Sequence, residues 1–227
     1  MNNTPTRLVV DAFTRTLHAL MALTFFLAYL TADTDTTGLR LIHVTLGYSF
    51  GGLLLLRLLW ALLGPRRVSL LALLGRAPGP TRLLALLKGG EWANLLRAAL
   101  PWSIAMLLLG ALPLLAAGYV TYFDTLGEWT EDLHETLGNA MLLAALVHAG
   151  TMLVLHWLPG PGVRPMLSGR VPGPGPDLVR QPLRALALMV VLLLTGFWGW
   201  QGWQYLNDPQ MRHPVSWLHP VGGPRSR

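Results

Sequence analysis

The 227-residue chain contains no cysteine. Disulfides, cysteine-held iron–sulfur clusters and thiolate nucleophiles are therefore excluded. The same absence excludes the covalent C-x-x-C-H attachment of a c-type haem. Any haem in this protein would be b-type and held without a covalent bond to the chain.

Charged side chains are also scarce. They make up 12% of the chain, about half of the roughly 25% found in soluble domains. Hydrophobic residues account for 52%, and the mean hydropathy is +0.46. This composition predicts an integral membrane protein surrounded by lipid. The formal net charge of +6 is concentrated in particular loops, which indicates membrane topology rather than nucleic-acid binding.

Five apolar stretches predict an all-α integral membrane protein with five spans, at residues 13–32, 39–63, 100–122, 130–157 and 183–206. Glycine and proline just past several of these stretches are typical helix stops. Segment 66–99 is apolar but broken by prolines and basic residues, which predicts a loop with one or two interfacial amphipathic helices. Segment 159–176 is rich in glycine and proline and is expected to be irregular.

Loop charges predict the orientation of these spans. Loop 64–99 carries six basic residues against Glu91, and loop 158–182 carries three against Asp177. The loops after the first and third spans are acidic, with Asp33, Asp35, Asp124, Glu128, Glu131 and Asp132. Because basic loops stay on the cytoplasmic side, we expect a cytoplasmic N-terminus and a periplasmic C-terminus in a bacterial inner membrane. The arginines of the tail (212, 225 and 227) run mildly against this rule.

Four histidines lie inside the apolar stretches. His134 and His148 are 14 residues apart in one span, so they point within about 40° of each other and lie roughly 21 Å apart along the helix. His18 is near the inner end of the first span, and His43 is near the outer start of the second. Depth therefore pairs His18 with His148 and His43 with His134, the arrangement that two stacked haems would need.

A short repeat accompanies the outer pair, because His43-Val-Thr-Leu-Gly47 resembles His134-Glu-Thr-Leu-Gly138. Gly47 and Gly138 lie one turn deeper on the histidine face, where a missing side chain leaves room for a flat macrocycle. Three arginines at suitable depths are candidates for binding haem propionates through their forked guanidinium groups. They are Arg15, Arg40 and Arg57.

Other interpretations of these histidines remain open. Each could make a hydrogen bond between helices, or the set could form a dinuclear metal site or a proton relay. Carboxylates are absent from the middles of these spans, which disfavours the last two. We predict no metal role for the remaining histidines, His156, His213 and His219.

Several motifs together resemble the prokaryotic cytochrome b561 family, which includes the cytochrome b subunits of nickel–iron hydrogenases and formate dehydrogenases. The motifs are Arg15-Thr-Leu-His18, Ile42-His43-Val-Thr-Leu-Gly47-Tyr48, Arg57-Leu-Leu-Trp60, Gly64-Pro65-Arg66, Leu133-His134-Glu135, His148 and Met166-Leu-Ser-Gly169. The resemblance covers roughly residues 10–170. It implies a four-helix bundle in which His18, His43, His134 and His148 ligate two b-type haems. Segment 98–102 departs from the family because it lacks a histidine that members often carry there.

These observations predict two regions, a haem-binding domain at residues 1–170 and a linker, fifth span and tail at residues 171–227. The expected function is electron transfer between the quinone pool and a periplasmic cytochrome c or another redox subunit, rather than stand-alone catalysis. One alternative is a self-contained oxidoreductase that passes electrons from superoxide to ubiquinone. The other is a cofactor-free helical transporter or scaffold.

Overall fold

A computed structural model describes residues 5–32, 37–64, 69–179 and 181–207. Its five long helices are α1 (Ala12–Leu30), α2 (Thr37–Leu63), α5 (Trp92–Tyr122), α6 (Trp129–Trp157) and α8 (Arg184–Asn207). All five are long and apolar enough to cross a membrane. The prediction of an all-helical membrane protein with five spans is therefore confirmed. The predicted loop residues 33, 35, 66 and 67, Arg180 and the tail lie outside the described residues.

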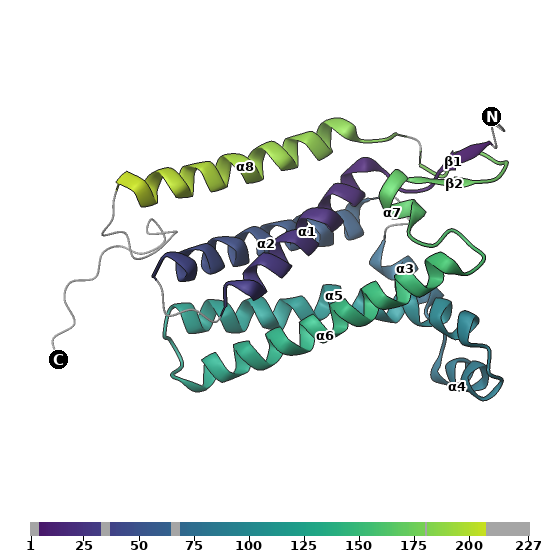
Figure 1. Cartoon of the computed structure of the whole chain (residues 1–227), viewed down its shortest axis with the longest axis horizontal. Coiled ribbons are helices and arrows are strands. Elements are labelled where there is room, and N and C mark those ends of the chain that lie inside the picture. The colour runs from purple at the N-terminus through teal and green to yellow at the C-terminus, as the bar shows by residue number, and fades with distance from the viewer. Residues whose placement is uncertain (1–4, 33–36, 65–68, 180, 208–227) are drawn as a thin grey trace.

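Two helical hairpins form the centre of the molecule (Figure 1). One hairpin consists of α1 packed against α2, and the other consists of α5 packed against α6. The contact between the two hairpins is made by α2 and α5. α8 lies along α1 and α2 on the side away from α5 and α6. The Trp198 indole N–H of α8 donates to Ser49 Oγ of α2 at 2.8 Å, so a polar contact adds to the apolar packing there.

The apolar core divides into two clusters. One joins α1, α2 and α8 through Phe13, Leu17, Leu53, Val190 and Leu194. The other joins α2, α5 and α6 through Phe50, Leu54, Leu108, Ala111, Leu114 and Met141; we call it the central cluster. Met141 lies midway between His134 and His148 in the sequence of α6. The central cluster therefore separates the level of His43 and His134, which we call outer, from the level of His18 and His148, which we call inner.

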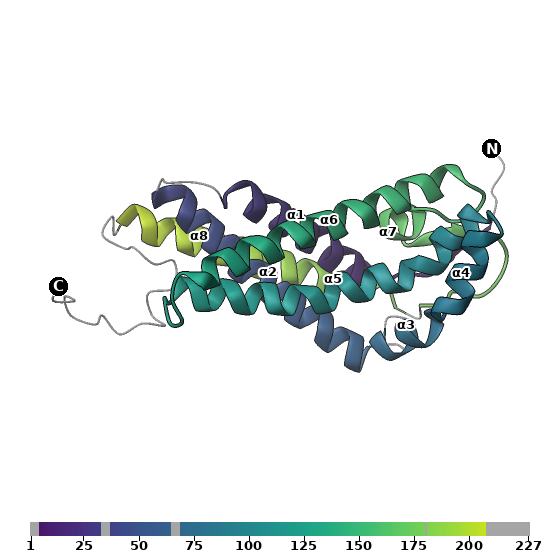
Figure 2. The same cartoon turned by 90° about the horizontal axis from the view of Figure 1, so that it is seen from below.

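The segment between α2 and α5 contains α3 (Leu70–Arg76) and α4 (Pro80–Lys88). These are the short helices expected there, and they lie beside the first turns of α5 (Figure 2). α5 itself begins eight residues before the expected start at residue 100. Among the described residues that suggested a loop, Arg76, Arg82, Lys88 and Arg97 lie within α3, α4 and α5, Pro80 begins α4, and Pro78 lies between α3 and α4.

A small sheet is an addition that the sequence did not predict. β1 (Thr6–Leu8) pairs antiparallel with β2 (Arg170–Pro172), with Arg7 opposite Val171. β2 follows α7 (Arg164–Ser168) in the segment expected to be irregular. Gly169 ends α7 at φ +77°, a backbone conformation that glycine adopts without steric cost. The expectation of an irregular segment at 159–176 was therefore wrong for residues 164–172.

Further contacts extend this sheet into a clasp, which we define as residues 6–15 together with 164–182. The Leu8 amide donates to Asp177 Oδ1 at 2.6 Å, and the Ala12 amide donates to the Pro182 carbonyl at 2.8 Å. Asp11 is fully buried and caps α1 by accepting from the Thr14 amide at 2.6 Å. The clasp holds the start of α1 against the chain that follows α6. The division into domains at residue 170 stays a prediction, and β2 crosses it.

Candidate functional site

His43 of α2 and His134 of α6 face each other across the bundle. Their ring centroids are 6.1 Å apart, and the ring planes meet at 82°. The two residues come from different hairpins and are 91 positions apart in the chain. The fold therefore brings together the two side chains that membrane depth predicts to be a pair.

Hydrogen bonds to backbone carbonyls orient both of these rings. His43 Nδ1 lies 2.8 Å from the Ala28 oxygen, and His134 Nδ1 lies 3.1 Å from the Leu114 oxygen. Because a carbonyl oxygen can only accept, each Nδ1 carries the proton and donates it. The lone pair of each ring is then on Nε2. A metal-binding histidine usually donates its other ring N–H to a carbonyl or carboxylate, which fixes the tautomer in the same way.

The separation of the rings also suits a metal ion between them. Metal–imidazole bonds are about 2 Å long and a ring centre lies roughly 1 Å beyond its nitrogen, so two ligands on opposite sides of one ion have centroids about 6 Å apart. The observed 6.1 Å agrees with that value. Two imidazoles supply the axial ligands that a haem iron needs, since the macrocycle supplies the other four nitrogens. The outer pair therefore fits a haem iron.

Three glycines near the outer pair differ in how much space surrounds them. No atom would lie within 4 Å of a Cβ added to Gly47, so space lies beside it. A Cβ on Gly138 would lie 4.0 Å from Leu114 Cδ1, an ordinary packing contact. A Cβ on Gly118 would lie 2.7 Å from His134 Cε1. Gly118 of α5 thus admits the His134 ring, a role that the sequence analysis missed.

The inner pair has a comparable arrangement around His148. Its Nδ1 lies 3.0 Å from Ser103 Oγ, and that hydroxyl donates its own hydrogen to the Leu100 carbonyl at 2.9 Å. Ser103 must therefore accept from His148, which again leaves the lone pair on Nε2. His18 of α1 lies within electrostatic range of His148. No sequence pattern marked Ser103 of α5 as the partner of His148.

The three candidate arginines lie at the two histidine levels. Arg57 is within electrostatic range of His18 and Asp11 at the inner level. Arg40 is exposed at the outer level, within range of Tyr122. Arg15 donates from Nη1 to the Leu167 carbonyl at 2.7 Å, so it belongs to the clasp as well. Roles toward a propionate stay predictions for all three.

Buried hydroxyls without a hydrogen-bond partner mark the outer level too. Tyr48 Oη and Thr121 Oγ1 both have this property. Tyr48 also packs edge-on against Tyr122, with ring centroids 6.4 Å apart. Such groups are costly inside a membrane unless a ligand satisfies them. The sequence analysis did not select them, because a tyrosine near a membrane surface usually belongs to an aromatic belt.

Metal centres of another kind find no support in the described part of the chain. No three side chains among its histidines, aspartates and glutamates gather closely enough to hold a metal ion. A dinuclear site would need such a cluster, whereas a haem iron needs only two protein ligands.

Comparison with known proteins gives one finding. The family model described as Prokaryotic cytochrome b561 matches residues 9–169, more than two thirds of the chain. No curated protein and no solved structure matches the chain significantly. The matched region includes all four paired histidines, the three candidate arginines and the three glycines considered above. With its five membrane-spanning helices and this match, the chain belongs to the prokaryotic cytochrome b561 family.

Proposed function

We propose that His43 and His134 ligate one haem b, that His18 and His148 ligate a second, and that electrons pass between them. Family membership implies a dihaem b-type membrane electron carrier; the assignment of ligands to this chain is the proposal. The observation that carries it is the outer pair, whose rings are 6.1 Å apart. Both rings donate Nδ1–H to carbonyls, at Ala28 and Leu114.

Each bound haem would supply one-electron chemistry. His43 and His134 would hold one haem and His18 and His148 the other, an arrangement that favours electron transfer over oxygen activation. The Ala28 and Leu114 carbonyls and Ser103 would keep the rings oriented. Arg40 at the outer level, and Arg15 and Arg57 at the inner one, would neutralise propionates.

The central cluster would set the environment between the two haems. Its buried members include Leu54 at 1% exposure and Ala111 at 0%, so water has little access to this layer. A low-dielectric layer raises the cost of charging either haem and so tunes its reduction potential. The chain would thus act by positioning and by electrostatics, while the haems carry the electrons.

We further propose that the clasp end faces the cytoplasm. This end carries the described basic residues Arg76, Arg82, Lys88, Arg97, Arg164 and Arg170, and it also holds β1, the first described element (Figure 1). The opposite end carries Asp124 and Glu128 between α5 and α6, and Glu131 and Asp132 in the first turn of α6. Retention of basic segments in the cytoplasm would then put the outer histidine pair near the periplasm.

A spectrum of the purified protein tests the assignment of function. We expect a reduced-minus-oxidised b-type α-band, two haems per chain by pyridine haemochrome assay, and reduction of both by an added quinol. Rapid reduction by superoxide without a protein partner would instead favour the self-contained oxidoreductase. A colourless, folded preparation would overturn the proposal in favour of a cofactor-free transporter or scaffold.

The partner at the periplasmic end is proposed to be a basic cytochrome c or another basic redox subunit. Four acidic residues between the end of α5 and the first turn of α6 would steer such a protein by long-range attraction. Because salt screens exposed charges beyond about 8 Å at physiological ionic strength, raising salt should slow electron exchange with cytochrome c several-fold. Stopped-flow mixing measures this rate. A rate independent of salt would contradict the steering, while leaving the haem assignment intact.

A further inference from the structure

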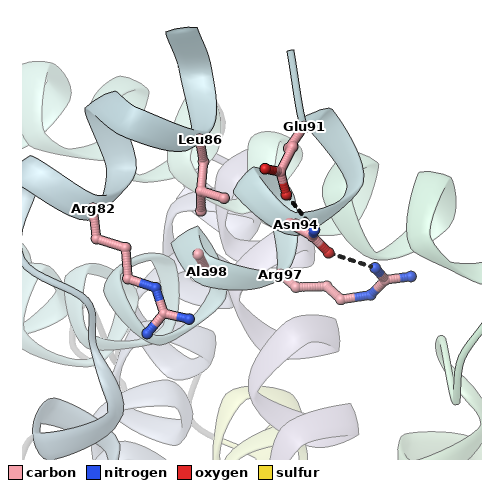
Figure 3. Close-up of a pocket in the computed structure, with 6 residues that line it drawn as sticks. All are labelled: Arg82, Leu86, Glu91, Asn94, Arg97 and Ala98. Atoms are coloured by element: carbon pink, nitrogen blue, oxygen red, sulfur yellow. Dashed lines mark hydrogen bonds between the residues drawn. The ribbon is translucent and has the colours of Figure 1, made fainter. Parts of the chain in front are cut away.

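The corner between α4 and α5 holds an open pocket of about 480 Å³. This volume lies within the roughly 300–1,000 Å³ typical of small-molecule sites. Arg82 and Leu86 of α4 line one side, Asn94, Arg97 and Ala98 of α5 line the other, and Glu91 lies between the helices (Figure 3). The pocket lies at the clasp end of the bundle, with Ala98 roughly 7.5 Å along α5 from Ser103, the hydrogen-bond partner of His148.

The length of α5 puts this pocket at the depth of lipid headgroups. The helix has 31 residues and is therefore about 46 Å long, whereas the hydrocarbon core is about 30 Å thick. Its apolar part corresponds to the span expected at residues 100–122. The turns before Leu100, which carry Asn94, Arg97 and Ala98, must then lie in the polar layer of the membrane.

The charges of the pocket favour an anion. Arg97 is held in place because Nη1 donates to Asn94 Oδ1 at 3.3 Å and Nη2 donates to the Pro159 carbonyl at 2.6 Å. A guanidinium has five N–H donors, so three remain available. The Arg82 side chain makes no hydrogen bond or ion pair within the described ranges. Glu91 Oε2 accepts from Asn94 Nδ2 at 2.7 Å, so its charge is partly satisfied and two arginines outweigh it.

Apolar side chains of the same two helices are exposed outside the pocket lining. Leu84 and Leu87 of α4 are 50% and 45% exposed, and Trp92 at the start of α5 is 62% exposed. The Trp102 indole N–H donates to the Pro78 carbonyl at 3.0 Å, which ties the loop between α3 and α4 to α5. A short helix that exposes leucines beside basic residues at headgroup depth is typical of an interfacial segment.

We propose that this pocket binds the phosphate of an anionic phospholipid, with Arg82 and Arg97 on the phosphate. Basic pockets between helices at the cytoplasmic surface are suited to such headgroups. Phosphate oxygens are well matched to the forked donors of arginine. The proposal does not depend on haem binding, because none of these residues lies at a histidine level.

The test is a lipid titration of the full-length protein in detergent, read by the thermal unfolding midpoint and by native mass spectrometry. Phosphatidylglycerol is expected to raise the midpoint saturably, whereas phosphatidylcholine at the same concentration is not. Arg82→Gln should weaken phosphatidylglycerol binding about fivefold, and the Arg82→Gln/Arg97→Gln double variant on the order of 20-fold. The matched control is Arg184→Gln, an exposed arginine at the start of α8 outside the pocket.

The outcomes are separable. Unchanged binding in the double variant, or equal stabilisation by phosphatidylcholine, would overturn the proposal. Inorganic phosphate that binds as tightly as the lipid would show a free-anion site and would also overturn the assignment to lipid. Arg97 makes hydrogen bonds to Asn94 and Pro159, so the double variant loses internal contacts. The Arg82→Gln variant removes no internal hydrogen bond, and it keeps the test valid if the double variant unfolds.

Discussion

Replacing His134 with alanine should reduce the haem content of the purified protein from two per chain to one. The reason is that His134 is proposed to supply one axial ligand of the outer haem, through the Nε2 left free by its bond to the Leu114 carbonyl. His43→Ala should remove the same haem, because the two rings face each other at 6.1 Å. Pyridine haemochrome quantification gives the stoichiometry, and potentiometric titration shows which haem is lost.

The matched control is His156→Ala. This histidine lies in the last turn of α6 and is exposed, so the variant should keep both haems. His18→Ala and His148→Ala should each remove the other haem. If His18→Ala and His134→Ala removed the same haem, the pairing by depth would be wrong. Two haems in the His134→Ala protein would remove this histidine from the ligand set.

Replacing Gly118 with alanine should weaken binding of the outer haem by roughly 10- to 100-fold, the range typical of disturbed second-shell contacts. The new Cβ would lie 2.7 Å from Cε1 of the His134 ring, closer than carbon atoms approach, so the ring must move. Movement would also break its hydrogen bond to Leu114. Haem titration of the apoprotein measures the affinity, and the α-band reports any change in ligation.

Gly52→Ala is the control, since no atom lies within 4 Å of a Cβ at that position. Alanine is the better helix former by about 1 kcal/mol, and both variants gain this advantage. A loss confined to Gly118→Ala would therefore be steric. In a cofactor-free scaffold the imidazole would simply rotate aside, and the variant would be at least as stable as the parent. Unaltered haem affinity would show that His134 tolerates displacement and is not a fixed ligand.

The helices were largely predictable because each span is a long apolar run with a clear stop. The start of α5 was not predicted, because Arg97 interrupts the hydropathy of the segment before residue 100 without interrupting the helix. Hydropathy locates the part of a helix that lies in lipid, and α5 continues beyond it.

The outer histidine pair could be anticipated, because orientation and helical rise assign each residue a depth. Gly118 could not, because a glycine in a span is equally suited to plain helix packing. Its contact with His134 depends on which helix faces which, and hydropathy does not carry that information. The contact of Ser103 with His148 could not be predicted for a similar reason. A serine in a helix commonly bonds to its own backbone, as this one does to the Leu100 carbonyl.

The short strands β1 and β2 lie outside the reach of pattern reading, because three residues are too few to show an alternation. Their pairing joins positions far apart in the chain, as the bond between Leu8 and Asp177 shows across 169 residues. Contacts of such long range add to the stability of a fold without leaving any local signature in the sequence.

The separation of β1 and β2 in the chain sets the order in which they become available during synthesis. During synthesis, residues 6–8 leave the ribosome before any of the helices, but their partner strand follows only after α6 has been translated. At about 5–20 residues per second, β1 waits on the order of ten seconds or more. The clasp can close only once α1, α2, α5 and α6 have all been inserted, so its closure marks the completion of the four-helix unit, and α8 then follows from Pro182, which the clasp already holds.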